Sequence, residues 1–242
     1  MLARGRTEKW ADNCIHYLTS GLDLKKKNCP VAHRSFLNFL NERYGVDVSK
    51  WLPRLKSRQS GVDLKVPSPE DVVETLLKVK DSRYFSVYLM LLASGLRLKE
   101  VVKILAEYDP ARLKVRDGVA LYELWWLRGT KRSYHAFWPS WMRFKRVAVS
   151  DENVSSFAGK AGLVRPKYMR KFVATRMIEL DISPDIVDFI QGRTPMRHVI
   201  LFTNYAALLN KATREYRKYA QWLKNFLEQN NILVCQQERK EI

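Results

Sequence analysis

The chain has 242 residues, of which 46% are apolar and 12% aromatic, so it can bury a sizeable core and is not generally disordered. Its 43 Lys and Arg residues outnumber 25 Asp and Glu residues, which gives a formal net charge of +18 and a pI near 9.9. Such an excess fits a polyanionic partner, either nucleic acid or an acidic membrane surface.

We expect neither a membrane span nor a signal peptide. The longest apolar stretch, Tyr84 to Ala93, is shorter than the ~18 residues that a spanning helix needs. The opening MLARGRTEKW lacks the apolar centre of a signal peptide. Cys14, Cys29 and Cys235 are scattered and without metal-ligand spacing, which predicts a reducing, intracellular setting.

The first part of the chain is expected to form short helices. TEKWADNCIHYLTSGL and VAHRSFLNFLNERYG place apolar residues at roughly helical spacing. Between them lies the basic run Lys25, Lys26 and Lys27. A charge run of this kind is by default solvated, but contact with a nucleic-acid backbone is plausible because this whole part of the chain is basic.

A linker and a strong helix start follow. SRQSGVDLKVPSPED is polar and contains Gly61 and two prolines. Ser68 is the expected N-cap, Pro69 the first helical residue and Asp71 the capping-box partner. We therefore predict a domain boundary near residue 65, between a small helical domain at 1–65 and a larger domain at 66–242.

The larger domain is predicted to be mainly α-helical with a small antiparallel sheet. EDVVETLLKVK, RYFSVYLMLLAS and LKEVVKILAEY predict three successive helices, the second ended by Gly95. Aromatic and β-branched runs then alternate with turns at Asp117-Gly118 and Arg128-Gly129-Thr130, which indicates short paired strands. Helices are expected again from Asp151 to the end of the chain.

The positive charge is clustered along this domain. No acidic residue occurs from Leu124 to Ser150, from Asn153 to Ile178, or from Phe189 to Arg214. A merely solvated surface would interleave the two signs. Arg132 and Lys171 lie in the first two windows and, with the run at 25–27, are our candidates for DNA binding.

One ordered set of residues stands out within this basic background. It consists of five cations and one phenol, with no nearby carboxylate cluster that could bind a metal ion. Arg97 lies at the seam between two apolar segments, with Glu100 one helical turn further on. The complete set is Arg97, Lys131, Lys167, Arg170, Arg193 and Tyr205.

This set resembles the active site of tyrosine recombinases of the phage-integrase family, and most of all that of the integrases of archaeal viruses and plasmids. The family's TGLR-x-x-E segment is matched by SGLR at 94–97 with Glu100. Its hairpin lysine is matched by Lys131, its H-x-x-R helix by KYMR at 167–170, and its nucleophilic tyrosine by Tyr205. Two positions depart from the family pattern. Lys167 stands where the family usually has histidine, and Arg193 stands where it has histidine or tryptophan. The resemblance covers about residues 68 to 210.

The chemistry of DNA strand exchange accounts for these residue types. A tyrosine that attacks the phosphodiester stores the bond energy in a covalent phosphotyrosine. Paired guanidiniums, here Arg97 and Arg170, stabilise charge on the non-bridging oxygens without a metal ion or other cofactor. Lys131 is expected to protonate the departing 5′-oxygen, while Lys167 and Arg193 add phosphate contacts. Tyr205 is the expected nucleophile.

The resemblance also implies a biological setting and leaves two rivals. It implies double-stranded DNA at an attachment site, a homotetramer on two duplexes, and integration or excision of a viral or plasmid genome. The rivals are a type IB topoisomerase-like enzyme and a non-catalytic DNA-binding regulator derived from an integrase. Tyr168, Tyr216 and Tyr219 compete with Tyr205 for the role of nucleophile, but Tyr216 and Tyr219 lie on an amphipathic helix that favours packing.

Overall fold

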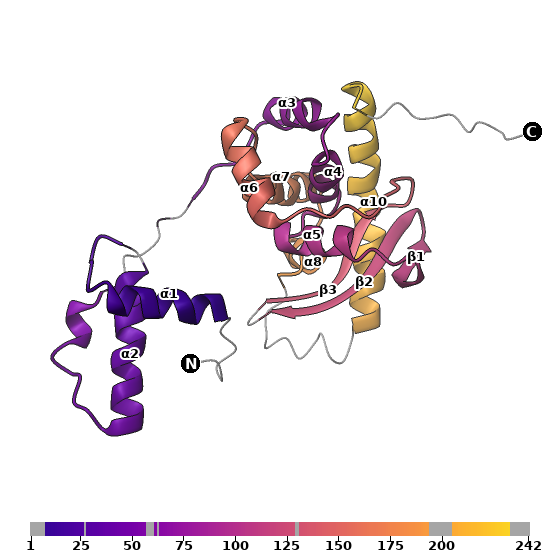
Figure 1. Ribbon diagram of the computed structural model, residues 1–242. Coiled ribbons are helices and arrows are strands. Elements are labelled where there is room, and N and C mark those ends of the chain that lie inside the picture. Colours follow the sequence, from indigo (N-terminus) through magenta and orange to yellow (C-terminus); the bar gives the residue numbers. More distant parts are fainter. Residues whose placement is uncertain are drawn as a thin grey trace, which may run out of the picture. The chain divides into compact units, whose positions relative to one another are not determined.

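The computed structural model divides the chain into two compact units, Met1–Leu64 and Lys65–Ile242 (Figure 1). The residues that it describes are 8–26, 28–56, 61, 63–128, 131–193 and 205–232; of residues 8, 9, 127, 128, 131 and 132 it describes the backbone alone. Each unit is considered by itself below.

The smaller unit is built on two helices that pack together, α1 (Glu8–Thr19) and α2 (Cys29–Tyr44). Cys14 on α1 and Cys29 on α2 are both buried. Gly45 ends α2 in a left-handed conformation with φ 66°, and its N–H donates to the carbonyl of Asn41. A short 3₁₀ turn, η2 (Leu52–Arg54), follows.

Three helices open the larger unit: α3 (Pro69–Val79), α4 (Phe85–Ser94) and α5 (Leu98–Ala106). The predicted capping box of α3 is confirmed, because Asp71 N–H donates to Ser68 Oγ at 3.1 Å and Ser68 N–H donates to Asp71 Oδ2 at 3.0 Å. Helix α4 is buried from Val87 to Ser94. The helix is therefore buried on every side along this stretch, as its nearly unbroken apolar sequence predicts.

A three-stranded antiparallel sheet follows a 3₁₀ turn, η3 (Pro110–Arg112), in the order β1-β2-β3. Its strands are β1 (Leu113–Arg116), β2 (Val119–Arg128) and β3 (Lys131–Pro139). The β2–β3 register runs from Val119 opposite Pro139 to Arg128 opposite Lys131, with a bulge between Glu123 and Trp126. This bulge interrupts the simple alternation of side chains along β2.

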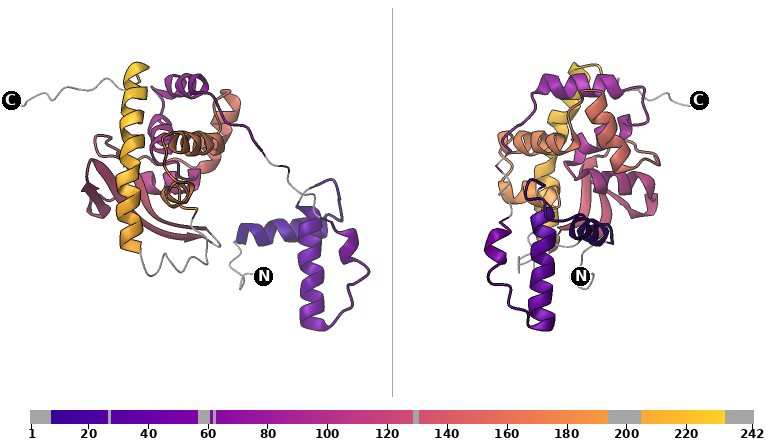
Figure 2. Two further views of the ribbon diagram at one scale, coloured as in Figure 1. Left: turned by 180° about the vertical axis from the view of Figure 1, so that it is seen from behind. Right: turned by 60° about the vertical axis from the view of Figure 1, so that its left-hand side comes forward.

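Helices α6 (Asp151–Lys160), α7 (Pro166–Glu179), α8 (Pro184–Ile190) and α10 (Tyr205–Gln229) complete the unit. Helix α10, in yellow, runs the length of the unit and packs against β2, β3, α7 and α8 (Figure 2). Tyr216 and Tyr219 are fully buried on α10, and their hydroxyls donate to the carbonyls of Ala93 and Leu92 at 2.6 and 2.7 Å. Both are packing residues, as the amphipathic pattern predicts.

The mainly helical fold with a small antiparallel sheet is therefore confirmed. Among the described residues, no helix combines the length and the apolar character needed to cross a membrane.

The turn at Gly95 joins α4 to α5 and generates a stability prediction. Gly95 has φ 61°, and a Cβ atom there would lie 2.5 Å from Nε2 of Gln191 and 2.9 Å from Cγ1 of Val173. Gly118 has φ 77° but would meet nothing within 4 Å. Gly118→Ala should cost about 1–2 kcal/mol for the left-handed backbone alone. Gly95→Ala should cost about 1–3 kcal/mol more, because its neighbours must move.

Urea unfolding of the two variants and the parent chain measures this difference. Equal losses for Gly95→Ala and Gly118→Ala would show that the packing around Gly95 yields without strain, contrary to the prediction.

Candidate active site

Arg97 is held by a buried carboxylate at the start of α5. Its backbone N–H donates to Glu100 Oε2 at 2.8 Å, and its Nη1 donates to Glu100 Oε1 at 2.9 Å. The Glu100 side chain is only 3% exposed. Nη1 of Arg97 also donates to the carbonyl of Gly192 at 2.8 Å. The predicted Arg97–Glu100 pair is therefore present, and it is anchored to a second segment of the chain.

Arg170, on α7, is a buried guanidinium beside the same carboxylate. The residue is 8% exposed, and its Nη1 lies 3.9 Å from Glu100 Oε2. Neither Nη1 nor Nη2 has a hydrogen-bond partner within the described part of the chain. Burial and the charges of Arg97 and Arg193 lower the pKa of Arg170 to about 9, so it stays cationic at neutral pH. A buried cation with unused donors favours binding of an anion.

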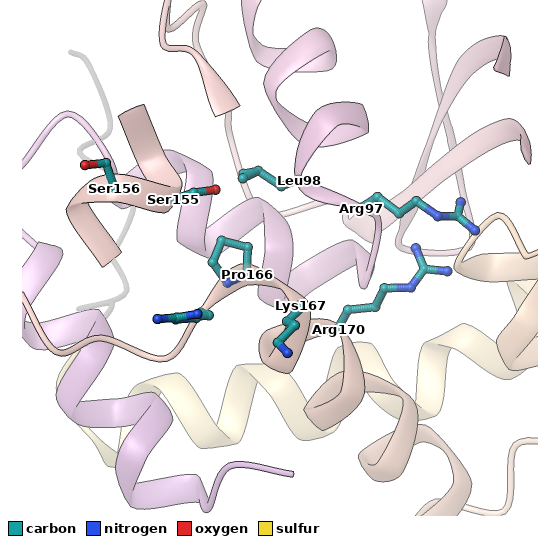
Figure 3. A pocket seen from close by; sticks show the side chains of 8 residues that line it. Arg97, Leu98, Ser155, Ser156, Pro166, Lys167 and Arg170 are labelled. Atoms are coloured by element: carbon teal, nitrogen blue, oxygen red, sulfur yellow. The ribbon is translucent and has the colours of Figure 1, made fainter. Parts of the chain in front are cut away.

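The two arginines border an open pocket of about 700 Å³. Figure 3 shows their guanidiniums close together at one side of the lining, with Arg97 extending from the start of α5 and Arg170 from α7. Besides the two arginines, the described lining contains two serines and two further cations, and no acidic side chain. It consists of Arg97, Leu98, Ser155, Ser156, Arg165, Pro166, Lys167 and Arg170.

The other three predicted cations are placed differently from one another. Lys167 lines the pocket, and its Nζ lies 4.4 Å from the centre of the Tyr168 ring. Arg193 follows α8 and does not line the pocket; its Nη1 lies 3.4 Å from Asp188 Oδ1 on the exposed side of that helix. Lys131 begins β3, with its backbone opposite Arg128, and its side chain lies outside the described residues.

Tyr205 is the first residue of α10 and packs against the sheet. Its hydroxyl is hydrogen-bonded to Nδ1 of His135 on β3. The centre of its ring lies 5.9 Å from that of Trp125, 5.7 Å from that of Tyr134 and 5.8 Å from that of Phe189 on α8. Burial raises the pKa of Tyr205 well above its ordinary value, so the phenol is protonated at neutral pH.

The turn after α8 connects these two groups of residues. Gln191 is fully buried, and its Nε2 donates to the carbonyl of Arg170 at 3.0 Å. Gly192 has φ 63°, and a Cβ atom there would lie 2.3 Å from Oγ of Ser133 on β3. Only glycine therefore lets the turn approach the strand closely enough for its carbonyl to meet Arg97.

Sequence reasoning missed four residues of this arrangement: Ser133, His135, Gln191 and Gly192. The QGR triplet before position 194 was a signal for the last two, since it marks a turn next to a predicted site residue. Ser133 and His135 had no local signal, because their partners lie on distant elements.

The DNA-binding candidates are on the surface where they are described. Lys25 and Lys26 are exposed in the turn between α1 and α2, and Lys26 Nζ lies 4.0 Å from Asp23 Oδ2. Lys171 Nζ lies 5.4 Å from the centre of the Tyr168 ring. Lys27 and the side chain of Arg132 lie outside the described residues. The described ranges contain no group of three or more His, Cys, Asp or Glu residues that could hold a metal ion.

Comparison with known proteins places the larger unit in a family. Two solved structures are similar to this chain. The crystal structure of XerA recombinase has 15% identity, covers 88% of this chain and 94% of that chain, and has a TM-score of 0.41. The structure of XerH site-specific recombinase bound to difH substrate in a pre-cleavage complex has 15% identity, covers 84% of this chain and 68% of that chain, and has a TM-score of 0.42. None of the curated proteins matches significantly. Residues 64–222 match the family described as archaeal phage integrase. Since this match spans more than half of the sequence, the chain belongs to the archaeal phage integrases, a family of tyrosine recombinases.

Proposed function

We propose that this chain cuts and rejoins DNA strands at a specific site through a covalent bond between Tyr205 and a 3′-phosphate. Family membership supports a role in DNA recombination. One observation carries the catalytic proposal: the buried Arg170 guanidinium has two Nη groups without hydrogen-bond partners in the described residues, beside Arg97 and an open pocket. A phosphodiester supplies the anion, and its two non-bridging oxygens suit two guanidiniums.

Each proposed residue has a separate role. Arg97 and Arg170 bind the non-bridging oxygens and stabilise the charge that develops on them. The phenol oxygen of Tyr205 attacks phosphorus, and the bond from phosphorus to the 5′-oxygen breaks. Lys131 gives a proton to that oxygen. Lys167 and Arg193 supply further positive charge to the phosphate. Rejoining is the reverse reaction, driven by the energy kept in the phosphotyrosine.

The proposed setting follows from family and charge. The partner is double-stranded DNA at an attachment site, with four protomers on two duplexes, inside the host cell. The smaller basic unit clamps the DNA, with Lys25, Lys26 and Lys27 near the backbone. The purpose is integration or excision of a viral or plasmid genome. A need for two copies of a defined site separates this function from that of a type IB topoisomerase-like enzyme.

Arg170→Ala should remove a contact that matters most in the transition state. Formation of the covalent adduct on a suicide DNA substrate should fall about 100-fold or more. DNA affinity should change little, because many other basic residues contact the backbone. Arg176→Ala is the matched control on the same helix, since Arg176 is engaged with Glu179 at 2.6 Å. An adduct at the parental rate from Arg170→Ala would remove Arg170 from the clamp.

Tyr205→Phe removes one oxygen and keeps the ring in its packing. The SDS-stable adduct and recombinant products should vanish, while DNA binding persists. Tyr168→Phe, Tyr216→Phe and Tyr219→Phe should still form the adduct; the last two should each lose about 1 kcal/mol of stability with their buried hydrogen bonds. Mass spectrometry of the adduct identifies the modified residue. A parent chain that binds its site but forms no adduct would instead be a non-catalytic regulator.

Strand cleavage should not depend on a divalent metal ion. The proposed phosphate contacts are guanidinium and ammonium groups, so excess EDTA should leave the rate of adduct formation unchanged. Strict dependence of that step on Mg²⁺ would point to a metal-dependent nuclease instead.

A further inference from the structure

We propose that His135 is a further catalytic residue, which accepts the phenolic proton of Tyr205 as the tyrosine oxygen attacks the DNA phosphate. This inference rests on the proposed function. Nδ1 of His135 is hydrogen-bonded to the Tyr205 hydroxyl, so the imidazole touches the reacting atom. The other proposed groups are arginines and lysines, which at neutral pH donate hydrogen bonds and cannot accept a proton.

Strand β3 carries this histidine next to the arginine pair. Ser133 and His135 are two residues apart, so their side chains leave the same face of the sheet about 7 Å from each other. Ser133 lies against Gly192, whose carbonyl accepts a hydrogen bond from Arg97. The same face of β3 therefore contacts the nucleophile through His135 and the turn that anchors Arg97 through Ser133.

The contact between His135 and Tyr205 is sheltered from water. His135 is 8% exposed. The ring centre of Trp125 lies 5.9 Å from those of both Tyr205 and His135, and Phe189 packs on Tyr205 from α8. Trp125 reaches this place through the bulge in β2, where its backbone has φ 44°. A bulge with a non-glycine residue at positive φ is costly and is typical of functional sites.

The charges around His135 suit a proton acceptor. Burial lowers its pKa, the Glu123 carboxylate raises it, and the Lys114 ammonium lowers it. Tyr134 and Tyr205 are the other titratable side chains against this part of the sheet. The net effect keeps the imidazole neutral at pH 7, with a lone pair free on Nδ1 when the proton is on Nε2. Glu123 lies opposite His135 in the β2–β3 register and stabilises the imidazolium that forms.

The step balances as follows. The bond between the Tyr205 oxygen and phosphorus forms while the bond from phosphorus to the 5′-oxygen breaks. The phenolic proton moves to Nδ1 of His135, and the 5′-oxygen takes a proton from Lys131. On rejoining, the 5′-hydroxyl returns its proton to the Lys131 amine as its oxygen attacks phosphorus. The bond from phosphorus to the tyrosine oxygen breaks, and His135 returns the phenolic proton to that oxygen.

Single-turnover adduct formation on a suicide DNA substrate tests this role. His135→Ala and His135→Gln should each slow the reaction about 100-fold or more with DNA affinity unchanged, because glutamine can accept the hydrogen bond but cannot take the proton. Free imidazole should restore part of the rate of His135→Ala. His16→Ala, which removes an exposed histidine of the smaller unit, should react like the parent chain.

The pH profile separates proton transfer from a purely structural role. His135 acts only when neutral, and its pKa is below the ordinary value of about 6.5, so the rate should fall only below that pH. Glu123→Gln removes a charge that raises this pKa, so the acid limb should move to lower pH. Glu123 is at the surface and the variant is expected to fold normally, which keeps the test valid even if His135→Ala unfolds.

Four results would overturn the proposal. Proton transfer to His135 is excluded if both His135 variants react at the parental rate. It is also excluded if Glu123→Gln leaves the acid limb of the pH profile in place. In either case an adduct on Tyr205 still supports the proposed function. A faster reaction in His135→Ala shows that the contact restrains Tyr205 instead of activating it. If the parent chain forms no Tyr205 adduct, the proposed function fails, and the role of His135 fails with it.

Discussion

The Glu100 carboxylate makes it possible for the partly buried Arg97 and the buried Arg170 to lie side by side. Arg97 binds it through both its backbone N–H and its side chain, while Arg170 lies 3.9 Å from its second oxygen. Two cations this close would repel each other in a poorly solvated place, and a lone buried carboxylate would be equally unfavourable. Each of the three charges therefore depends on the others, and α5 and α7 are held together by the same contacts.

These three charged groups leave an excess of one positive charge, which an anion can neutralise. Two guanidiniums and one carboxylate give a net charge of about +1, and a phosphodiester carries one negative charge. The hydrogen bonds agree with this charge balance. Arg97 donates to Glu100 and Gly192, whereas the Nη groups of Arg170 have no hydrogen-bond partner among the described residues. Donors that are already held in place stabilise developing negative charge without first having to reorganise.

The site is assembled from two sets of elements that meet at one turn. The arginines come from α5 and α7, whereas Tyr205 and His135 come from α10 and the sheet. The turn at Gln191 and Gly192 touches both sets, since it contacts Arg170, Arg97 and the strand residue Ser133. A displacement of this turn would therefore change the relation between the phosphate clamp and the nucleophile, although neither turn residue takes part in the chemistry.

The sequence by itself determined the features that depend on near neighbours. Ser68 and Asp71 cap a helix three residues apart, Gly95 ends another, and Arg97 meets Glu100 within one helical turn. The order and spacing of the cations and Tyr205 were enough to indicate the family. Tyr216 and Tyr219 were separated from Tyr205 by the amphipathic pattern of their helix. Each of these signals is local, because helical periodicity and capping act over three or four residues.

Only the tertiary structure decided which of these groups meet. Two contacts arise where distant elements pack: the Gly192 carbonyl meets Arg97 at a separation of 95 residues, and His135 meets Tyr205 at a separation of 70. The burial of Arg170, whose Nη groups have no hydrogen-bond partner in the described part of the chain, arises in the same way. Arg193 matched the family spacing, and the structure adds that it pairs with Asp188 and that its charge acts on Arg170, although it does not line the pocket. Such contacts are set by strand register, a bulge and close approach at a glycine, and these leave no periodic pattern in the sequence.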